Sequence, residues 1–254
     1  MRELVQIVVQ NAIIHWSCRE GAGTVLLAAT AFARYEYTLK IEMSFYTPSD
    51  SNFTRLHQEE IDMVFSGIDC VLNDEQAIYC SSELTSGARL YDVLRENELK
   101  TAAELKEKLG KAWWGTNIFE ANVKLGKEFA QRVRNSLNDK TMVITPGPFS
   151  ARDWSQPEYL FFWETLLRTR IKSAWFNQNW QFSNGCTFEF AVAYDAGIPT
   201  FDHNGTPLDV GEAIELVASA IRQLGADGFD TSKLAENLKR LGTVRENAGT
   251  LSSV

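Results

Sequence analysis

The stretch that decides the fold is SNGCTFEFAVAYDAGIPT, residues 183–200. It follows an apolar run at 172–177 and predicts, in order, a loop, a short helix and the next strand. Ser183 is placed to cap this helix, because its hydroxyl can accept a hydrogen bond from an N–H of the first turn. Gly185 would let a ligand approach the backbone closely, and free N–H groups at a helix N-terminus favour an anion.

Glu189 lies four residues after Gly185, so it projects from the same helix face one turn further on. A phosphate on the N–H groups, with a carboxylate one turn above it, suits a nucleotide whose sugar must meet an acid. The alternative is that Glu189 is an exposed helical acid without chemistry. Ser183 and Gly185 have an equivalent alternative as ordinary capping and turn residues.

Two motifs stand out in the part of the chain from residue 75 onward. They are Trp180-x-x-Ser183-x-Gly185-x-x-x-Glu189-x-x-x-Ala193-x-x-x-Gly197-Ile198-Pro199 and Ala77-Ile78-Tyr79-Cys80-Ser81-Ser82. Together they resemble the nucleoside 2-deoxyribosyltransferase-like superfamily, which includes deoxyribosyltransferases and deoxynucleoside monophosphate N-glycosidases. The Trp-x-x-Ser-x-Gly start is most similar to the uncharacterised, often phage-borne branch. The resemblance covers residues 75–224 and implies a Rossmann- or flavodoxin-like parallel sheet with helices on both faces.

The resemblance also implies a chemistry, which is N-glycosidic bond cleavage or exchange on a nucleotide or nucleoside. In the family, the glutamate at the position of Glu189 attacks the anomeric carbon and forms a glycosyl-enzyme ester. Hydrogen-bond donors around the loop are expected to keep this carboxylate ionised. The usual second acid is replaced by Asn-Gln-Asn at 177–179, which leaves Asp153 and Glu158 as substitutes. This departure favours the alternative, a nucleotide-binding or sensing module that turns nothing over.

The candidate ligand contacts lie at the ends of predicted strands or on the elements that follow them. They are Tyr79, Ser81, Ser82, Arg89, Asn177, Trp180, Ser183 and Gly185. In a parallel α/β sheet, ligands bind outside the carboxyl ends of the strands. Simpler roles remain open: Tyr79 as a buried strand aromatic, Arg89 as a solvated helix residue and Trp180 as a packing residue.

Strand and helix patterns alternate from residue 76 onward. Strands are predicted at 77–81, 142–145, 172–177 and 198–201, and helices at 87–97, 101–110, 117–137, 157–169, 209–225 and 233–241. This alternation predicts a mostly parallel sheet covered on both faces. Residues 90–118, which contain Trp113 and Trp114, are an insertion relative to the family's usual first crossover and a candidate lid or oligomer contact.

Three regions are expected: an N-terminal extension at 1–74, an α/β domain at 75–242 and a flexible tail at 243–254. Gly242 is expected to end the last helix. Within the extension, apolar residues at 4, 7, 8, 12 and 13 recur at helical spacing, and 58–72 is an amphipathic helix. Residues 24–34 fit a helix and 35–46 a strand. The extension contains no motif that indicates its role.

The composition is that of a soluble globular protein, with 44% apolar and 23% charged residues. A net charge of −8 argues against nucleic acid or an anionic membrane as a partner. The four cysteines show no CxxC spacing and the three histidines lie far apart, so we expect no metal or cofactor. No apolar run resembles a signal peptide or approaches the roughly 20 residues of a membrane span. We therefore expect a cytoplasmic protein, and the family resemblance implies that it is a homo-oligomer that binds a small nucleotide or nucleoside.

Overall fold

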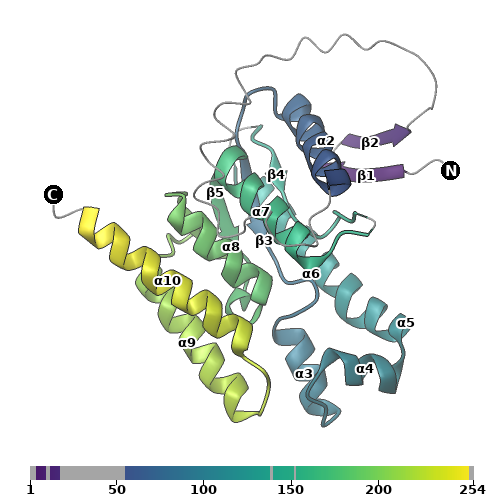
Figure 1. Cartoon of the computed structure of the whole chain (residues 1–254), viewed down its shortest axis with the longest axis vertical. Helices are drawn as coiled ribbons and strands as arrows, with labels where there is room; N and C mark the ends of the chain where they lie inside the picture. The colour runs from purple at the N-terminus through teal and green to yellow at the C-terminus, as the bar shows by residue number, and fades with distance from the viewer. Residues whose placement is uncertain (1–3, 10–11, 18–54, 138–139, 152, 252–254) are drawn as a thin grey trace.

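The computed structural model describes residues 4–9, 12–17, 55–137, 140–151 and 153–251. A four-stranded sheet lies at the centre of the molecule, surrounded by helices (Figure 1). Its strands are β3 (Ala77–Ser81), β4 (Val143–Ile144), β5 (Ile171–Phe176) and β6 (Thr200–Phe201). They lie in the order β4-β3-β5-β6, and every neighbouring pair is parallel. The predicted α/β fold with a parallel sheet is confirmed.

The helices fall close to their predicted positions. They are α2 (Arg55–Leu72), α3 (Ala88–Glu96), α4 (Ala102–Leu109), α5 (Lys111–Trp114), the π-helical η1 (Gly115–Glu120), α6 (Ala121–Ser136), α7 (Gln156–Arg170), the 3₁₀ turn η2 (Trp180–Phe182), α8 (Asn184–Asp195), α9 (Val210–Ala226) and α10 (Ser232–Leu251). The predicted capping box is present at the start of α4, where Thr101 and Glu104 bond each other's backbone N–H. No helix in the described ranges is long and apolar enough to cross a membrane.

The central strand β3 is buried on both faces, because its side chains alternate between two helical layers. Ile78 and Cys80 pack against α6 in a cluster that also holds Phe129, Ala130, Val133 and Val143. Ala77 and Tyr79 face the opposite layer, formed by α7 and α8, within the largest core cluster. Helices therefore cover both faces of the sheet, as predicted.

The strand order reverses between β3 and β5. After β3 the chain crosses to β4 on one side, and after β4 it crosses back to β5 on the other side. The carboxyl ends of β3 and β5 are therefore neighbours whose following loops diverge, and Asn177 N–H donates to Ser81 O at 3.1 Å. Crevices at such reversals are the usual ligand sites of open α/β sheets. The prediction that Ser81, Thr145 and Asn177 follow or end neighbouring parallel strands is confirmed.

Helix α2 belongs to the main core, although the predicted boundary at residue 74 separates it from the α/β domain. Its apolar stripe (Ile61, Val64, Phe65, Ile68 and Leu72) is buried in the same cluster as α7. The rings of Phe65 and Phe162 stack with centroids 4.9 Å apart. The predicted amphipathic helix at 58–72 is confirmed, and burial of its stripe explains why it joins the α/β unit.

Two predictions about the ends of the chain are wrong. Residues 4–9 and 12–17 form an antiparallel pair, β1 (Leu4–Val9) with β2 (Ala12–Ser17), instead of a helix. The β-branched residues that fill this segment favour strands, and they outweighed the helical spacing. At the other end, α10 continues through Gly242 to Leu251. A helical glycine costs only about 1 kcal/mol, and α10 gains packing against α8 and α9. The elements predicted at 24–34 and 35–46 lie outside the described residues.

A second, smaller core forms from α3, α4, η1, the end of α9, the connection that follows it and the start of α10. It contains Leu90, Tyr91, Leu94, Leu105, Ile118, Leu224, Phe229 and Leu234. Trp114 lies at its edge, with its ring stacked on Phe119 and the Lys106 ammonium 3.9 Å from the ring centroid. The segment predicted as an insertion thus packs against the end of α9 (Figure 1).

Glycine-to-alanine exchange should have opposite effects in α6 and α2. A Cβ at Gly126 would lie 2.4 Å from Ser82 Oγ and 3.2 Å from Ser82 Cβ, whereas one at Gly67 would meet nothing within 4 Å. We expect Gly126→Ala to destabilise the protein by about 1–2 kcal/mol through overpacking. Gly67→Ala should stabilise it by about 0.5–1 kcal/mol through helix propensity. Urea unfolding measures both, and equal effects of the two exchanges would contradict the close approach of α6 to Ser82.

Candidate functional site

The predicted signature helix is α8, and its N-terminus is capped as expected. Ser183 is the N-cap, and its Oγ accepts a hydrogen bond from Cys186 N–H at 3.4 Å. Glu189 lies in the second turn and is only 6% exposed. The alternative in which Glu189 is an exposed helical acid is therefore wrong. The helix is buried on nearly every side, since each residue from 186 to 193 is in the core.

Glu189 is held from the end of β3. Ser81 Oγ donates a hydrogen bond to Glu189 Oε2 at 2.6 Å, which is the short distance typical of a hydroxyl bound to a carboxylate. Tyr79, two residues earlier on the same strand face, is fully buried and lies beside the same carboxylate. Its hydroxyl acts on Glu189 electrostatically, yet no described group meets hydrogen-bond geometry with it. The structure thus brings together Tyr79, Ser81 and Glu189, as the sequence predicted.

Burial dominates the electrostatics of this site. It raises the pKa of Glu189 to about 7, while the Ser81 and Tyr79 hydroxyl groups act in the opposite direction. No cation in the described part of the chain contributes to this shift. Glu189 is therefore divided between its charged and neutral forms near pH 7, so the expected hydrogen-bond donors keep it only partly ionised. Burial and the Glu189 charge raise the pKa of Tyr79 well above its usual range, so Tyr79 keeps its proton.

Two buried cysteines lie on the elements that form the site but are unsuited to nucleophilic chemistry. Cys80 on β3 and Cys186 on α8 are buried and form no disulfide. Burial raises the pKa of both thiols above the usual range for cysteine, so neither forms a thiolate near neutral pH.

Sequence reasoning missed Glu83, which follows the end of β3. Its Oε1 accepts a hydrogen bond from Ala88 N–H at 3.1 Å, at the N-terminus of α3. The carboxyl group fills the place of a side chain at Gly87, where an added Cβ would lie 2.2–2.6 Å from its atoms. Burial raises the pKa of Glu83 to about 7, and its charge also acts on Cys186 of α8. The available signal was an acid two residues beyond a strand end, at the edge where ligands bind.

The loop that carries Glu83 also reaches the first turn of α8. Ser86 Oγ accepts a hydrogen bond from Asn184 N–H at 3.2 Å. The hydroxyl groups of Ser86 and Ser183 lie 3.3 Å apart, within hydrogen-bond distance. Two serine hydroxyls therefore occupy backbone N–H groups at the start of α8.

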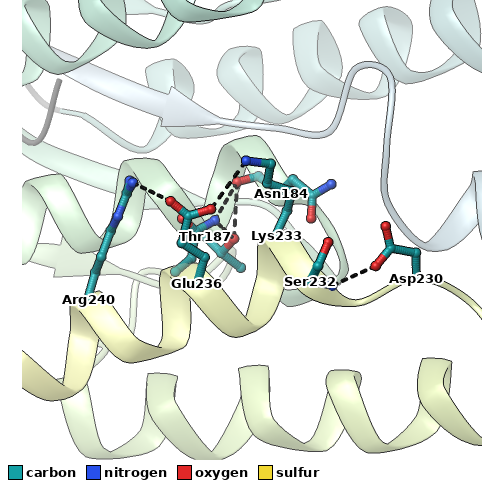
Figure 2. Close-up of polar contacts among 8 residues, drawn as sticks. Asn184, Thr187, Asp230, Ser232, Lys233, Glu236 and Arg240 are labelled. Carbon is teal, nitrogen blue, oxygen red and sulfur yellow. Dashed lines mark hydrogen bonds and ion pairs between the residues drawn. The ribbon is translucent and has the colours of Figure 1, made fainter.

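Helix α10 supports the same turn from the other side. Asn237 is 6% exposed, and its Nδ2 donates to Asn184 O at 3.0 Å and to Thr187 Oγ1 at 2.8 Å. Figure 2 shows Asn184 and Thr187 next to α10, which also carries Lys233, Glu236 and Arg240. These three form ion pairs along α10, with Glu236 bonded to Arg240 at 2.7 Å. Asn237 thus fixes the turn from which Glu189 projects.

The remaining predicted residues lie at varying distances from this centre. Trp180 stacks on Phe190 with ring centroids 4.9 Å apart and is 4% exposed, so it is a core residue. Arg89 is exposed, and its Nε donates to Asn117 O at 2.7 Å. Asp153 is exposed in a turn before α7, with no described contact to Glu189.

Four other predicted positions lie near the carboxyl edge of the sheet. Ser82 is buried on the α6 side of β3, where its Oγ has no described partner. Asn177 follows β5 and is half-buried, and its Oδ1 accepts from Gln178 N–H. Ser183 caps α8, and Gly185 has space beside it, since only Ser183 Oγ lies within 4 Å of an added Cβ.

Comparison of the chain with models of known protein families, with curated proteins and with solved structures finds no match. Within the described ranges, no three histidine, cysteine or acidic side chains are grouped as a metal site would require.

The buried carboxyl should make stability depend on pH. A pKa raised from 4.5 to about 7 means that folding favours the protonated form, so the stabilisation is complete below pH 4.5 and is lost as the pH rises through 7. Glu189→Gln cannot ionise and should gain roughly 3 kcal/mol relative to wild type between pH 4.5 and pH 8, at about 1.4 kcal/mol per pKa unit. Urea unfolding at the two pH values measures this difference. The other carboxyls contribute equally to the pH dependence of wild type and variant, so they cancel in the comparison. A difference in unfolding free energy that does not change with pH would contradict burial of the Glu189 carboxyl.

Removing the Asn237 side chain should loosen the start of α8. Asn237→Ala leaves a buried carbonyl and a buried hydroxyl without this donor, at a cost of about 2 kcal/mol. Lys233→Ala on the same helix removes an ion pair of a side chain that is 70% exposed, and it should change stability by less than about 1 kcal/mol. Thermal unfolding compares the two variants. Equal stability of both would show that α10 does not support this turn.

Proposed function

We propose that this chain cleaves or exchanges the N-glycosidic bond of a nucleoside or nucleotide, with Glu189 as the nucleophile. The observation that carries the proposal is the buried Glu189 carboxyl, held by Ser81 where the strand order of a parallel sheet reverses. A buried carboxyl that no described cation neutralises lowers the stability of the fold. Acids whose pKa values are strongly shifted concentrate at functional sites. The resemblance of residues 180–199 to a family with a glutamate nucleophile supplies the reaction.

In the first proposed step, a carboxylate oxygen of Glu189 attacks the anomeric carbon of the sugar. A C–O bond forms, the C–N bond breaks, and the base leaves with the electron pair and takes up a proton. In the second step, water or another base attacks the same carbon. The ester breaks, Glu189 recovers its carboxylate, and the attacking group loses a proton. Ser81 would orient the nucleophile throughout, because its hydroxyl holds the second oxygen.

The departing base needs a proton donor, and Glu83 is a better candidate than Asp153. Glu83 lies on the loop that follows β3, and its pKa of about 7 leaves part of it protonated at neutral pH. Asp153 is exposed and has no described contact with Glu189. Neutral carboxylic acids with raised pKa values are suited to protonating leaving groups near pH 7.

The second candidate function is binding without turnover. It is favoured by the nearly complete burial of Glu189 and by the Asn-Gln-Asn sequence at 177–179, which offers amides in place of an acid. In that case Glu189 would accept a hydrogen bond from a sugar hydroxyl. Both candidate functions use the same residues and differ only in whether a bond is broken.

Incubation with nucleosides and nucleotides separates the two functions. Wild type should release free base, measured by chromatography, and Glu189→Ala should reduce the rate by at least about 10³-fold while affinity changes by less than about tenfold. The plot of kcat/KM against pH should be bell-shaped with a maximum near pH 7, because Glu189 must be ionised and Glu83 must be protonated. A 2-fluoro sugar analogue should add mass to the peptide that contains Glu189.

Ser81→Ala is the matched control for the pH dependence. Loss of the Ser81 donor raises the pKa of Glu189, so the rise in rate should move to higher pH. Full activity of Glu189→Ala would reject the nucleophile. Tight binding of a ligand by wild type with no base release would establish the binding module instead.

A further inference from the structure

The groups that act on the two carboxyls of the site, Glu189 and Glu83, are neutral or acidic. The groups that shift the pKa of Glu189 are the hydroxyls of Ser81 and Tyr79 together with burial. Glu83 adds a second carboxyl on the neighbouring loop, and Asp92 also acts on it. No lysine or arginine of the described residues contributes to either shift. A phosphate placed here would meet like charges at short range in a poorly solvated site, which is unfavourable.

Two of the backbone N–H groups that could attract a phosphate at the start of α8 are already bonded within the protein. Asn184 N–H donates to Ser86 Oγ, and Cys186 N–H donates to Ser183 Oγ. The two serine hydroxyls lie within hydrogen-bond distance of each other. The start of α8 therefore has an internal cap where a phosphate site would need free donors. Arg89, a candidate ligand contact, is exposed, and its Nε donates to Asn117 O.

Unpartnered hydroxyl groups collect at the same edge of the sheet. Ser82 Oγ, from a residue that is 4% exposed, has no hydrogen-bond partner among the described groups, and Tyr79 Oη on the opposite face of β3 lies near Glu189 without hydrogen-bond geometry. Thr145 Oγ1, just after β4, is buried and unpartnered too, and both it and Ser82 Oγ border the Cβ position of Gly126. Buried polar atoms without partners are rare in native proteins, so a cluster at one edge indicates a polar ligand. Hydroxyl groups donate and accept, which suits uncharged hydroxyl and amide groups.

We propose that the site around Tyr79, Ser81, Ser82 and Glu189 selects an uncharged, hydroxyl-bearing ligand, namely a nucleoside in preference to its 5′-monophosphate. The inference deepens the proposed function, on which it rests for the nucleoside nature of the ligand. It also replaces the expectation of a phosphate at Ser183, because that residue is used as a cap. The selectivity arises from carboxyl charge that no cation of the described residues offsets, so it should weaken when the charge is removed.

Binding to matched pairs tests this selectivity. The full chain is titrated by calorimetry at pH 8 with 2′-deoxyadenosine, 2′-deoxyguanosine, 2′-deoxycytidine and thymidine, and with the 5′-monophosphate of each. We expect at least one nucleoside to bind at least tenfold more tightly than its monophosphate. In Glu189→Gln this ratio should fall at least threefold, because the variant retains the shape and loses the charge. Glu107→Gln makes the same charge change on an exposed face of α4 and should leave the ratio unaltered.

Two results would overturn the inference: a monophosphate that binds as tightly as its nucleoside, or no binding by any nucleoside of the panel. Base release, followed in the same samples, separates this inference from the proposed function. Selective nucleoside binding without base release would reject catalysis and leave the ligand class standing. Faster base release from monophosphates than from nucleosides would leave catalysis standing and reject the ligand class.

Discussion

The hydrogen bond between Ser81 and Glu189 is the interaction on which the rest of the site depends. It joins the end of the central strand to the second turn of α8, across 108 residues of sequence, with a donor–acceptor distance of 2.6 Å. A carboxyl group that is 6% exposed needs such a partner, because burial without one would be far more costly. The bond therefore sets the position of α8 against β3, and through it the geometry of every neighbouring group.

This requirement explains the layered packing around α8. The helix is covered by α7 on one side and by α10 on another, and its start is fixed by Ser183, Ser86 and Asn237. The contacts of Ser183 and Ser86 satisfy N–H groups that the start of a helix leaves unpaired, and Asn237 bonds the Asn184 carbonyl and the buried Thr187 hydroxyl. Residues from three separate segments therefore hold a single helical turn, and together they fix the position of the helix that carries Glu189.

Local signals in the sequence predicted the α/β unit well, and signals that depend on tertiary contacts were missed. The capping residues Thr101 and Ser183 and the alternating strands fix their own elements, so their positions were predicted correctly. The end of α10 was not predicted, because packing against α8 overrides Gly242. Tyr79, Ser81 and Glu189 were found because the carboxyl ends of parallel strands share one edge. Glu83 was missed because its burial depends on α3 and Gly87. Residue spacing also does not predict the raised pKa of Glu189 or the hydrogen bond from the start of α8 to Ser86.

The support that α10 gives to α8 bears on the order in which the protein matures during synthesis. Asn237 leaves the ribosome 53 residues after Asn184, the residue whose carbonyl it binds. Domains fold as their segments emerge, at about 5–20 residues per second, so the sheet and α8 are available for several seconds before their last partner. Throughout that interval the first turn of α8 lacks its Asn237 donor. The first turn of α8 is consequently completed only after α10 has left the ribosome, and until then the carboxyl of Glu189 lies on a helix whose start lacks one of its supports.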